Sequence, residues 1–229
     1  MRKCEQCIVR QFNSLKELTK DELLRMSNCK TSKVTKKGEV LFNEGEYVNG
    51  VFCIKEGVCK VSKISDNGKE QIIHLIKSGD LLGERSLISG ETSNLKATAL
   101  NDMEICFIPK QEIISDLREN QNFSMSVLKK MANSLKNADN FIVDIALKTV
   151  KQRLAHLLLY LDNNFKKNKE GAIDILLSRE DIGSVIGTAT ESAIRLLSEF
   201  KKKKIINLKG KQIFILNSVA LEKVSKGYE

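Results

Sequence analysis

The sequence lacks the features of a membrane-spanning, secreted or catalytic protein. It has no run of about 18 apolar residues, and its N-terminus, MRKCEQCIVRQFNSL, has no apolar segment of the kind that a signal peptide carries. Only two histidines occur, His74 and His156, and neither a P-loop nor a nucleophile elbow is present. We therefore expect a cytoplasmic protein with no membrane partner, and an enzyme is the weakest interpretation.

The six cysteines do not indicate a disulfide scaffold. A chain of 229 residues with 41% hydrophobic residues can build a core without cross-links. The cytosol also keeps thiols reduced. The cysteines are therefore predicted to be free thiols or metal ligands.

Positive charge is concentrated in the last third of the chain. Residues 146–229 hold 16 Lys and Arg against 9 Asp and Glu, so this part carries +7 of the total net charge of +9. A basic surface confined to one domain is typical of a domain that binds a polyanion.

Residues 34–109 read as short strands separated by glycines. The segment VCKVSKI alternates with period two, and DNG before KEQIIHLI is a strong hairpin signal because Asn and Gly accept positive φ at little cost. Many short strands at regular spacing predict a barrel or jelly roll.

After FIPKQEI the apolar period changes to that of a helix. The spacing predicts a narrow seam on a long helix that packs against another helix along its length. The seam residues are Leu128, Met131, Leu135, Ala138, Ile142 and Ile145. A helix that lies on its own barrel is the alternative, but the polar residues between favour a parallel homodimer.

The remainder reads as a helix, two helices joined by a turn, and two short strands around a Lys-Gly-Lys turn, which together predict a winged helix. The fold class is therefore α+β: an N-terminal β jelly-roll barrel, a long dimerisation helix and a C-terminal winged helix-turn-helix. We expect a sensor domain at residues 1–120, the dimerisation helix at 121–146 and the winged helix at 147–229.

The helix-turn-helix prediction depends on the spacing within SREDIGSVIGTATESAIRLL. Small Gly183 lets two helices approach closely, and Gly187 supplies the positive φ that turns the chain between them. Thr190 caps or opens the second helix. The residues expected to face inward are Ile182, Ile186, Ala193 and Leu196.

The outward face of the second helix is predicted to read DNA bases, through Glu191 and Arg195 with Thr190 and Ser192 beside them. Arg can donate two hydrogen bonds to guanine, and Glu can accept one from cytosine N4. A solvated salt bridge between Glu191 and Arg195 is the alternative, with a stabilisation of only about 0.2–0.5 kcal/mol. Phosphate contacts are expected near this helix and in the wing. They are Ser178, Arg179, Lys209 and Lys211.

On these segments the whole chain resembles the Crp/Fnr family of bacterial transcription regulators. The segments KKGEVLFNEGE, GVFCIKEGVCKVSK, SGDLLGERSLI and CFIPKQEI look like the family's cyclic-nucleotide-binding-type barrel, and LSREDIGSVIGTATESAIRLL looks like its DNA-reading motif. The resemblance implies double-stranded DNA and RNA polymerase as partners. It also implies a TGA-like half-site core read by Glu191 and Arg195.

The resemblance leaves the effector open. Members that bind cyclic nucleotides carry Gly-Glu early in a phosphate cassette and Arg-Ser/Thr-Ala later, because a buried phosphodiester needs a fork-like cation. Gly83 and Glu84 match, but Ser93 and Asn94 stand where Arg-Ser is expected, and Arg85 does not occupy the matching place. We therefore expect these five residues to form an effector pocket that does not bind a cyclic nucleotide.

An iron–sulfur cluster, as in oxygen-sensing relatives, is the other effector that the resemblance implies. Cys4 and Cys7 match the start of such a ligand set, and Cys106 falls where those relatives place their distant cysteine. No cysteine follows Cys7 at short spacing, so Cys29 is the next candidate. Four deprotonated ligands held together are required.

Two functions from different classes remain open. The first is a homodimeric, sequence-specific DNA-binding regulator controlled through its barrel. The second is a ligand-binding regulatory module whose winged helix docks a protein instead of DNA. The charge of +7 in residues 146–229 favours DNA.

Overall fold

The computed structural model describes residues 4–228, so the predicted domain ends at residues 1–3 and 229 lie outside the described residues. The chain forms two compact units. The first contains most of the chain up to residue 136, and the second contains residues 137 onward together with 64–72. No helix within residues 4–228 is long and apolar enough to cross a membrane.

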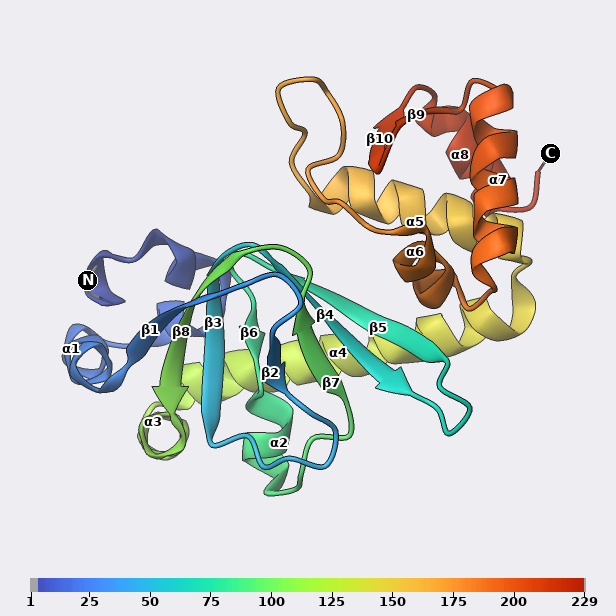
Figure 1. Cartoon of the computed structure of the whole chain (residues 1–229). Coiled ribbons are helices and arrows are strands. Elements are labelled where there is room, and N and C mark those ends of the chain that lie inside the picture. The colour runs from blue at the N-terminus through green and yellow to red at the C-terminus, as the bar shows by residue number, and fades with distance from the viewer. Residues whose placement is uncertain (1–3, 229) are drawn as a thin grey trace. The chain divides into compact units, whose positions relative to one another are not determined.

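The first unit is built around two four-stranded sheets, whose strands are labelled in Figure 1. One sheet has the order β1 (Thr31–Thr35), β8 (Met103–Pro109), β3 (Gly50–Glu56) and β6 (Leu81–Leu82). The other has the order β2 (Val40–Phe42), β7 (Lys96–Ala99), β4 (Val58–Ile64) and β5 (Glu70–Lys77). Apart from β4 and β5, which are consecutive, neighbours in each sheet are distant in the chain, as in a jelly roll, which confirms the predicted class of fold.

The predicted hairpin turn lies between β4 and β5. Ser65 N–H donates to the carbonyl of Lys69 at 2.9 Å, and Gly68 N–H donates to the carbonyl of Ser65 at 2.8 Å. Gly68 has a φ of 78°, which an L side chain would oppose. The turn prediction from Asn67 and Gly68 is therefore confirmed.

Period-two alternation along β3 and β8 divides the first unit into two cores. Ile54 and Ile105 face the core between the two sheets. Val51, Cys53, Cys106 and Ile108 face the opposite way, into a second core. The sheet that contains β3 and β8 is therefore buried on both faces.

Short helices of the first unit supply the second core. The N-terminal part forms the 3-10 turns η1 (Cys4–Gln6), η2 (Ile8–Phe12) and η3 (Ser14–Glu17), followed by α1 (Lys20–Cys29). Later come α2 (Glu84–Ser89) and α3 (Lys110–Glu119). Thr19 starts α1 with a capping box, in which its side chain accepts from Glu22 N–H and the Glu22 carboxylate accepts from Thr19 N–H.

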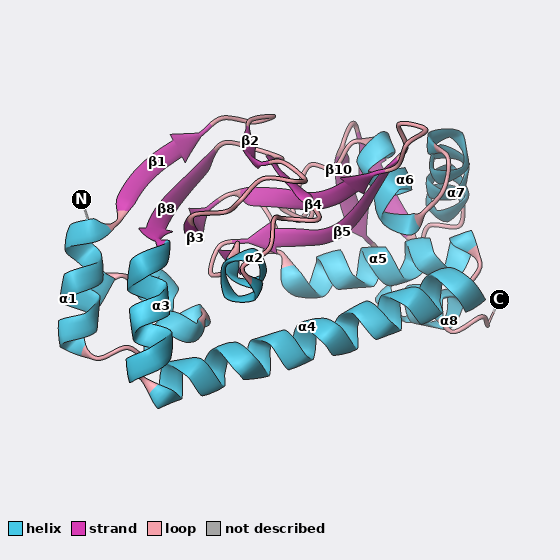
Figure 2. Ribbon diagram, turned by 90° about the horizontal axis from the view of Figure 1, so that it is seen from below, coloured by secondary structure: helices cyan, strands magenta, loops and turns pink. Residues whose placement is uncertain are grey.

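The long helix α4 (Gln121–Leu147) is continuous (Figure 2). Phe123 and Val127, in its first two turns, are buried in the second core of the first unit. Beyond them the predicted seam is exposed or half-buried along Leu128, Met131, Leu135, Ala138, Ile142 and Ile145. Packing on the barrel therefore covers the start of α4 and leaves the apolar seam open within the described chain.

The second unit has the elements of a winged helix. Its helices are α5 (Val150–Asn164), α6 (Arg179–Ile186), α7 (Thr190–Lys202) and α8 (Ser218–Ser225). Strands β9 (Ile206–Lys209) and β10 (Gln212–Ile215) pair antiparallel around Gly210, as predicted for the wing. The core of this unit includes Leu154, Leu158, Ile182, Ile186, Ala193, Leu197 and Phe200.

Candidate DNA interface and sensor sites

The turn between α6 and α7 is set by two glycines. Gly187 has a φ of 65° and ends α6 in the left-handed conformation. At Gly183 a Cβ atom would lie 3.0 Å from the backbone carbonyl oxygen of Thr188. Only a small residue fits there without displacing the turn, which is the reason for the predicted spacing.

Helix α7 begins at Thr190, and Ala189 is its N-cap residue. Thr190 therefore opens the helix and does not cap it. Ala193 is buried as predicted, but the expected inward position of Leu196 is wrong: Leu196 is half-buried, and Leu197 is the buried residue. Phe200, three residues on, continues the buried stripe.

The base-reading candidates lie on the exposed side of α7. Glu191 and Arg195 are exposed and one helical turn apart, while Thr190 and Ser192 are half-buried. Among the described residues no ion pair joins Glu191 to Arg195. Both side chains are therefore available to a partner, and the salt-bridge alternative has no support in the structure.

The four phosphate candidates lie at the start of α6 and in the wing. The Ser178 hydroxyl caps α6, accepting from Asp181 N–H at 2.9 Å and donating to Asp181 Oδ2 at 2.6 Å. Arg179 Nη2 donates to the Gly210 carbonyl at 2.8 Å, which ties α6 to the wing turn. Lys209 pairs with Glu170 at 3.0 Å, and Lys211 is exposed. Ser178 and Arg179 thus also hold the local structure together.

Sequence reasoning missed Arg153, which joins three chain segments of the second unit. Its Nε donates to the Ile186 carbonyl at 2.7 Å, at the end of α6. Its Nη1 donates to the carbonyls of Ile145 and Lys148 at 3.1 and 2.8 Å, at the end of α4. Its Nη2 lies 3.4 Å from the Gly187 carbonyl. The planar guanidinium fork suits this role because it directs several donors at once. No local sequence pattern predicts this role of Arg153, because its partners are backbone carbonyls.

A polar contact joins α4 to α5 beside Arg153. His156 Nδ1 is 2.7 Å from Asp144 Oδ2, and Lys148 also pairs with Asp144 at 2.8 Å. His156 thus contacts the preceding helix through a side-chain carboxylate.

The residues of the predicted effector pocket bind one another or α4. Gly83 has a φ of 102°, and Glu84 is buried. Lys130 of α4 lies 2.8 and 3.1 Å from the two carboxylate oxygens of Glu84 and donates to the Leu81 carbonyl at 3.2 Å. Glu84 is thus engaged by the long helix.

The other cassette residues are engaged locally. Arg85 donates to the Asn94 side chain, and the Ser93 hydroxyl donates to the Leu95 carbonyl at 2.8 Å. None of these contacts supplies a buried, unpaired cation for a phosphodiester.

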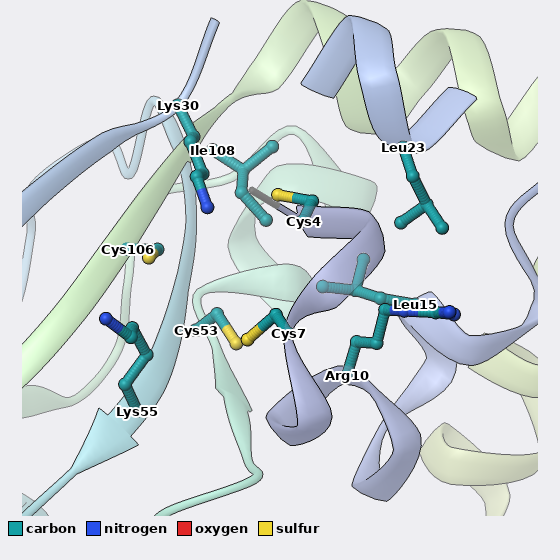
Figure 3. A pocket seen from close by; sticks show the side chains of 10 residues that line it. All are labelled: Cys4, Cys7, Arg10, Leu15, Leu23, Lys30, Cys53, Lys55, Cys106 and Ile108. Atoms are coloured by element: carbon teal, nitrogen blue, oxygen red, sulfur yellow. The ribbon is translucent and has the colours of Figure 1, made fainter. Parts of the chain in front are cut away.

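Three of the four predicted metal ligands line one cavity, shown in Figure 3. They are Cys4, Cys7 and Cys106, and the fourth cysteine at the cavity is Cys53. Cys29 is exposed and does not line it. The structure therefore brings three of the predicted cysteines together with Cys53 and places Cys29 apart from them. The pairing of Cys53 with Cys106 across two strands cannot be seen in the sequence.

The donor set was tested for its fit to an iron–sulfur cluster. Four thiols from three chain segments supply the number and the type of ligand that such a cluster takes. Burial, together with the neighbouring thiolates of Cys106, Cys7 and Cys4, raises the pKa of Cys53 to about 12, so without a metal this group is a neutral thiol. The type of donor fits, but within residues 4–228 no three His, Cys, Asp or Glu side chains lie close enough together to hold a metal ion, so the arrangement does not fit a cluster.

Two family models match the two parts of the chain. The cyclic nucleotide-binding domain matches residues 32–120, and the Crp-like helix-turn-helix domain matches residues 152–224. The first match describes the barrel, and the second covers the helices that carry Glu191 and Arg195.

Similar proteins match over almost the whole length. The fumarate and nitrate reduction regulatory protein of Vibrio cholerae is 30% identical, over 95% of this chain and 88% of its own. The anaerobic regulatory protein of Pasteurella multocida is 29% identical, over 97% and 82%. The structure of FixK2 from Bradyrhizobium japonicum has a TM-score of 0.79 at 24% identity, over 85% of this chain and 96% of that one.

These relatives are transcription regulators, and none of the features above describes an enzyme site. Both family domains and a relative at 30% identity agree with the barrel, the long helix and the winged helix. The chain therefore belongs to the Crp/Fnr family of transcription regulators, with a helix-turn-helix domain for binding DNA.

Proposed function

We propose that this protein is a homodimeric regulator that reads a DNA palindrome with a TGA-like half-site core and is controlled by an effector or redox signal at its N-terminal domain. In this proposal residues 1–120 are the sensor domain, 121–146 the dimerisation helix and 147–229 the DNA-binding domain. RNA polymerase is the further partner that the family implies, and the site of action is the cytoplasm.

The proposal depends on Glu191 and Arg195 of α7, which are both exposed and which form no ion pair with each other within residues 4–228. Side chains one turn apart on a helix in the major groove reach neighbouring base pairs. Arg195 suits guanine O6 and N7, and Glu191 suits cytosine N4. Together they fit the G·C pair of a TGA core and its neighbour.

Charge around α7 supports contact with the phosphate backbone. Lys201–Lys204 follow Arg195 on the chain, and Lys202 and Lys204 have no ion pair among the described residues. Lys209 and Lys211 flank the wing turn at Gly210. Such contacts position the duplex and carry no sequence information.

The seam on α4 supports a two-fold dimer. Leu128, Leu135 and Ile142 are each at least 60% exposed, which is costly in water for a stripe of this length. A second copy of the helix would cover the stripe. Two recognition helices would then read half-sites about 34–36 Å apart on one face of the DNA.

The base-reading role is tested by Arg195→Ala, with Lys211→Ala as the matched control for loss of one positive charge. We expect Arg195→Ala to lose about 1–3 kcal/mol of discrimination at a single base pair of the half-site. Lys211→Ala should weaken binding to specific and random duplexes equally. Fluorescence anisotropy with single-base-substituted palindromes measures both. If Arg195→Ala weakened binding to every duplex equally, Arg195 would have no base-reading role.

A salt titration separates this function from a winged helix that docks a protein. DNA binding releases counterions, so log K should fall linearly with log salt, with a slope of about −0.9 for each phosphate contacted. Lys211→Ala should make the slope less steep by roughly one contact. Binding that does not depend on salt, or no binding to any duplex, would favour the protein-docking alternative.

A further inference from the structure

An ion pair joins the short helix α2 to the long helix α4 within the first unit. Lys130 Nζ lies 2.8 and 3.1 Å from the two carboxylate oxygens of Glu84, and it donates to the Leu81 carbonyl at 3.2 Å. Figure 2 shows α2 beside α4. An ammonium group has three N–H donors, so these three acceptors match the whole capacity of Lys130.

Glu84 is held in the interior by the turn that precedes it. Gly83 has a φ of 102°, and a Cβ atom at this position would lie 2.9 Å from the Gly50 carbonyl oxygen. Glu84, the first residue of α2, is only 8% exposed. A carboxylate that is removed from water needs a partner of opposite charge, because an unpaired buried charge is costly. Among the described residues 4–228, Lys130 is the cation that supplies this partner.

Lys130 lies on the face of α4 that attaches this helix to the barrel. Phe123, Val127 and Lys130 are spaced four and three residues apart, which places them on one side of the helix. Glu84, Phe123 and Val127 line a cavity of only about 10 Å³, which has room for about one water. The ion pair therefore borders a closely packed apolar contact, where water screens two charges less than it does on an open surface.

The contact between the barrel and α4 ends one residue after Lys130. Met131 packs against the second core of the first unit, whereas residues 132–137 are all exposed. The apolar seam continues through this exposed part at Leu135. The pair therefore lies in the last turn of α4 that the barrel holds, directly before the part of the seam that is left open.

We propose that the Glu84–Lys130 pair is an internal substitute for a ligand in the predicted effector pocket, and that it holds α4 in position for dimer formation with no small molecule bound. A ligand can control α4 only through contacts that differ between two positions of the helix. Lys130 already makes the connection between the two elements from within the chain. The inference rests on the proposed homodimer and states how its long helix is positioned.

The test compares Lys130→Met with Lys129→Met in the full chain. Lys129 is exposed at the neighbouring position of α4, so its substitution removes the same charge and leaves the pair intact. Amide hydrogen exchange in residues 124–136 should become at least about tenfold faster in Lys130→Met, because Glu84 is left buried without a cation. The dimer dissociation constant from sedimentation equilibrium should rise at least about tenfold. Lys129→Met should leave both quantities unchanged.

Glu84→Gln and the double variant with Lys130→Met separate a specific pair from a general loss of packing. The double variant should exchange no faster than Lys130→Met alone, because both substitutions remove one and the same interaction. Lys130→Gln keeps N–H donors and takes the place of Lys130→Met if that variant does not fold. The inference fails if the two substitutions act independently, or if Lys130→Met behaves like Lys129→Met.

Native mass spectrometry of the wild type tests whether a small molecule is needed. We expect a dimer with the mass of two chains. A small molecule bound to each chain, and lost in both Glu84→Gln and Lys130→Met, would overturn the inference. Palindrome binding is measured separately by fluorescence anisotropy. A wild type that dimerises and shows the expected exchange pattern, but binds no duplex, would end the proposed DNA function and leave this inference standing.

Discussion

At the scale of single residues, the most unusual carboxylate is Asp116 of α3. Its side chain is fully buried beside Arg25 of α1, with Glu112 close to the same guanidinium. Burial raises the pKa of Asp116 from 3.8 to about 6; Arg25 opposes the shift, and the Glu22 and Glu112 carboxylates add to it. The folded protein therefore holds a proton on Asp116 at pH values where the unfolded chain has released it.

This shift predicts that Asp116 costs stability as pH rises. The protonated Asp116 contributes its full stabilisation below about pH 4, and this stabilisation is lost as the pH rises through about 6. The shift corresponds to about 3 kcal/mol in the free energy of unfolding. In Asp116→Asn that dependence should disappear. Urea unfolding of the wild type and of Asp116→Asn at several pH values between 4 and 7 measures the difference between their free energies of unfolding. The contributions of the other titrating groups are the same in both proteins and cancel in this difference.

Asp102→Asn is the control for this measurement. Asp102 is exposed, and its hydrogen bond with Lys36 and the backbone N–H of Lys37 lower the pKa of Asp102, so its effect has the opposite sign. It contributes stability that is lost as pH falls. An Asp116→Asn curve parallel to the wild-type curve over the whole range would contradict the assigned shift.

At the scale of elements, Arg153 connects the end of α4 to the turn of the helix-turn-helix. Its donors reach carbonyls at both helix ends, where the helix dipole also favours a positive charge. The Arg153 side chain therefore links the last turn of α4 to the Gly187 turn. This contact lies entirely within the second unit.

We expect Arg153→Leu to lower the free energy of unfolding of the winged helix by about 1–3 kcal/mol, because carbonyls at the ends of α4 and α6 lose their donor. Arg153→Lys should recover only part of this, since an ammonium group lacks the planar fork. The affinity for the specific DNA site should fall more in Arg153→Leu than in Arg153→Lys. Thermal unfolding and anisotropy titrations measure the two effects. Arg118→Leu, an exposed arginine on α3, controls for charge.

The turns between elements were the features of the fold that could be predicted from the sequence. The wing, the β4–β5 hairpin and the turn at Gly187 were predicted because a positive φ or a short loop is a local property that glycine reveals. Leu196 was assigned inward in error because the rotation of α7 depends on its packing against the other helices.

Long-range contacts were not predictable in the same way. Arg153 contacts carbonyls 33 and 34 residues away, and Lys130 reaches Glu84 across 46 residues. The cavity partnership of Cys53 with Cys106 depends on strand register. None of these has a spacing pattern, so each requires the folded chain, whereas the prediction for Glu191 and Arg195 came from their place in a local motif.

At the scale of the whole molecule, the central question is what covers the apolar seam of α4. Phe123 and Val127 are buried on the barrel, but Leu135 is 65% exposed and Ile142 is 65% exposed. A parallel partner helix would place Leu135 against its own copy near the two-fold axis. The dimer is then the species that joins two recognition helices on one palindrome.

Leu135→Glu should shift the protein from dimer to monomer, because it places two carboxylates against each other in an apolar seam. Asn133→Glu adds the same charge at an exposed polar position of α4 and should leave the dimer intact. Sedimentation equilibrium measures the association. Binding to the full palindrome should fall far more than binding to a single half-site, since the contacts of each α7 are unchanged. A Leu135→Glu protein that remains dimeric would place the interface elsewhere, and the proposed half-site spacing would lose its basis.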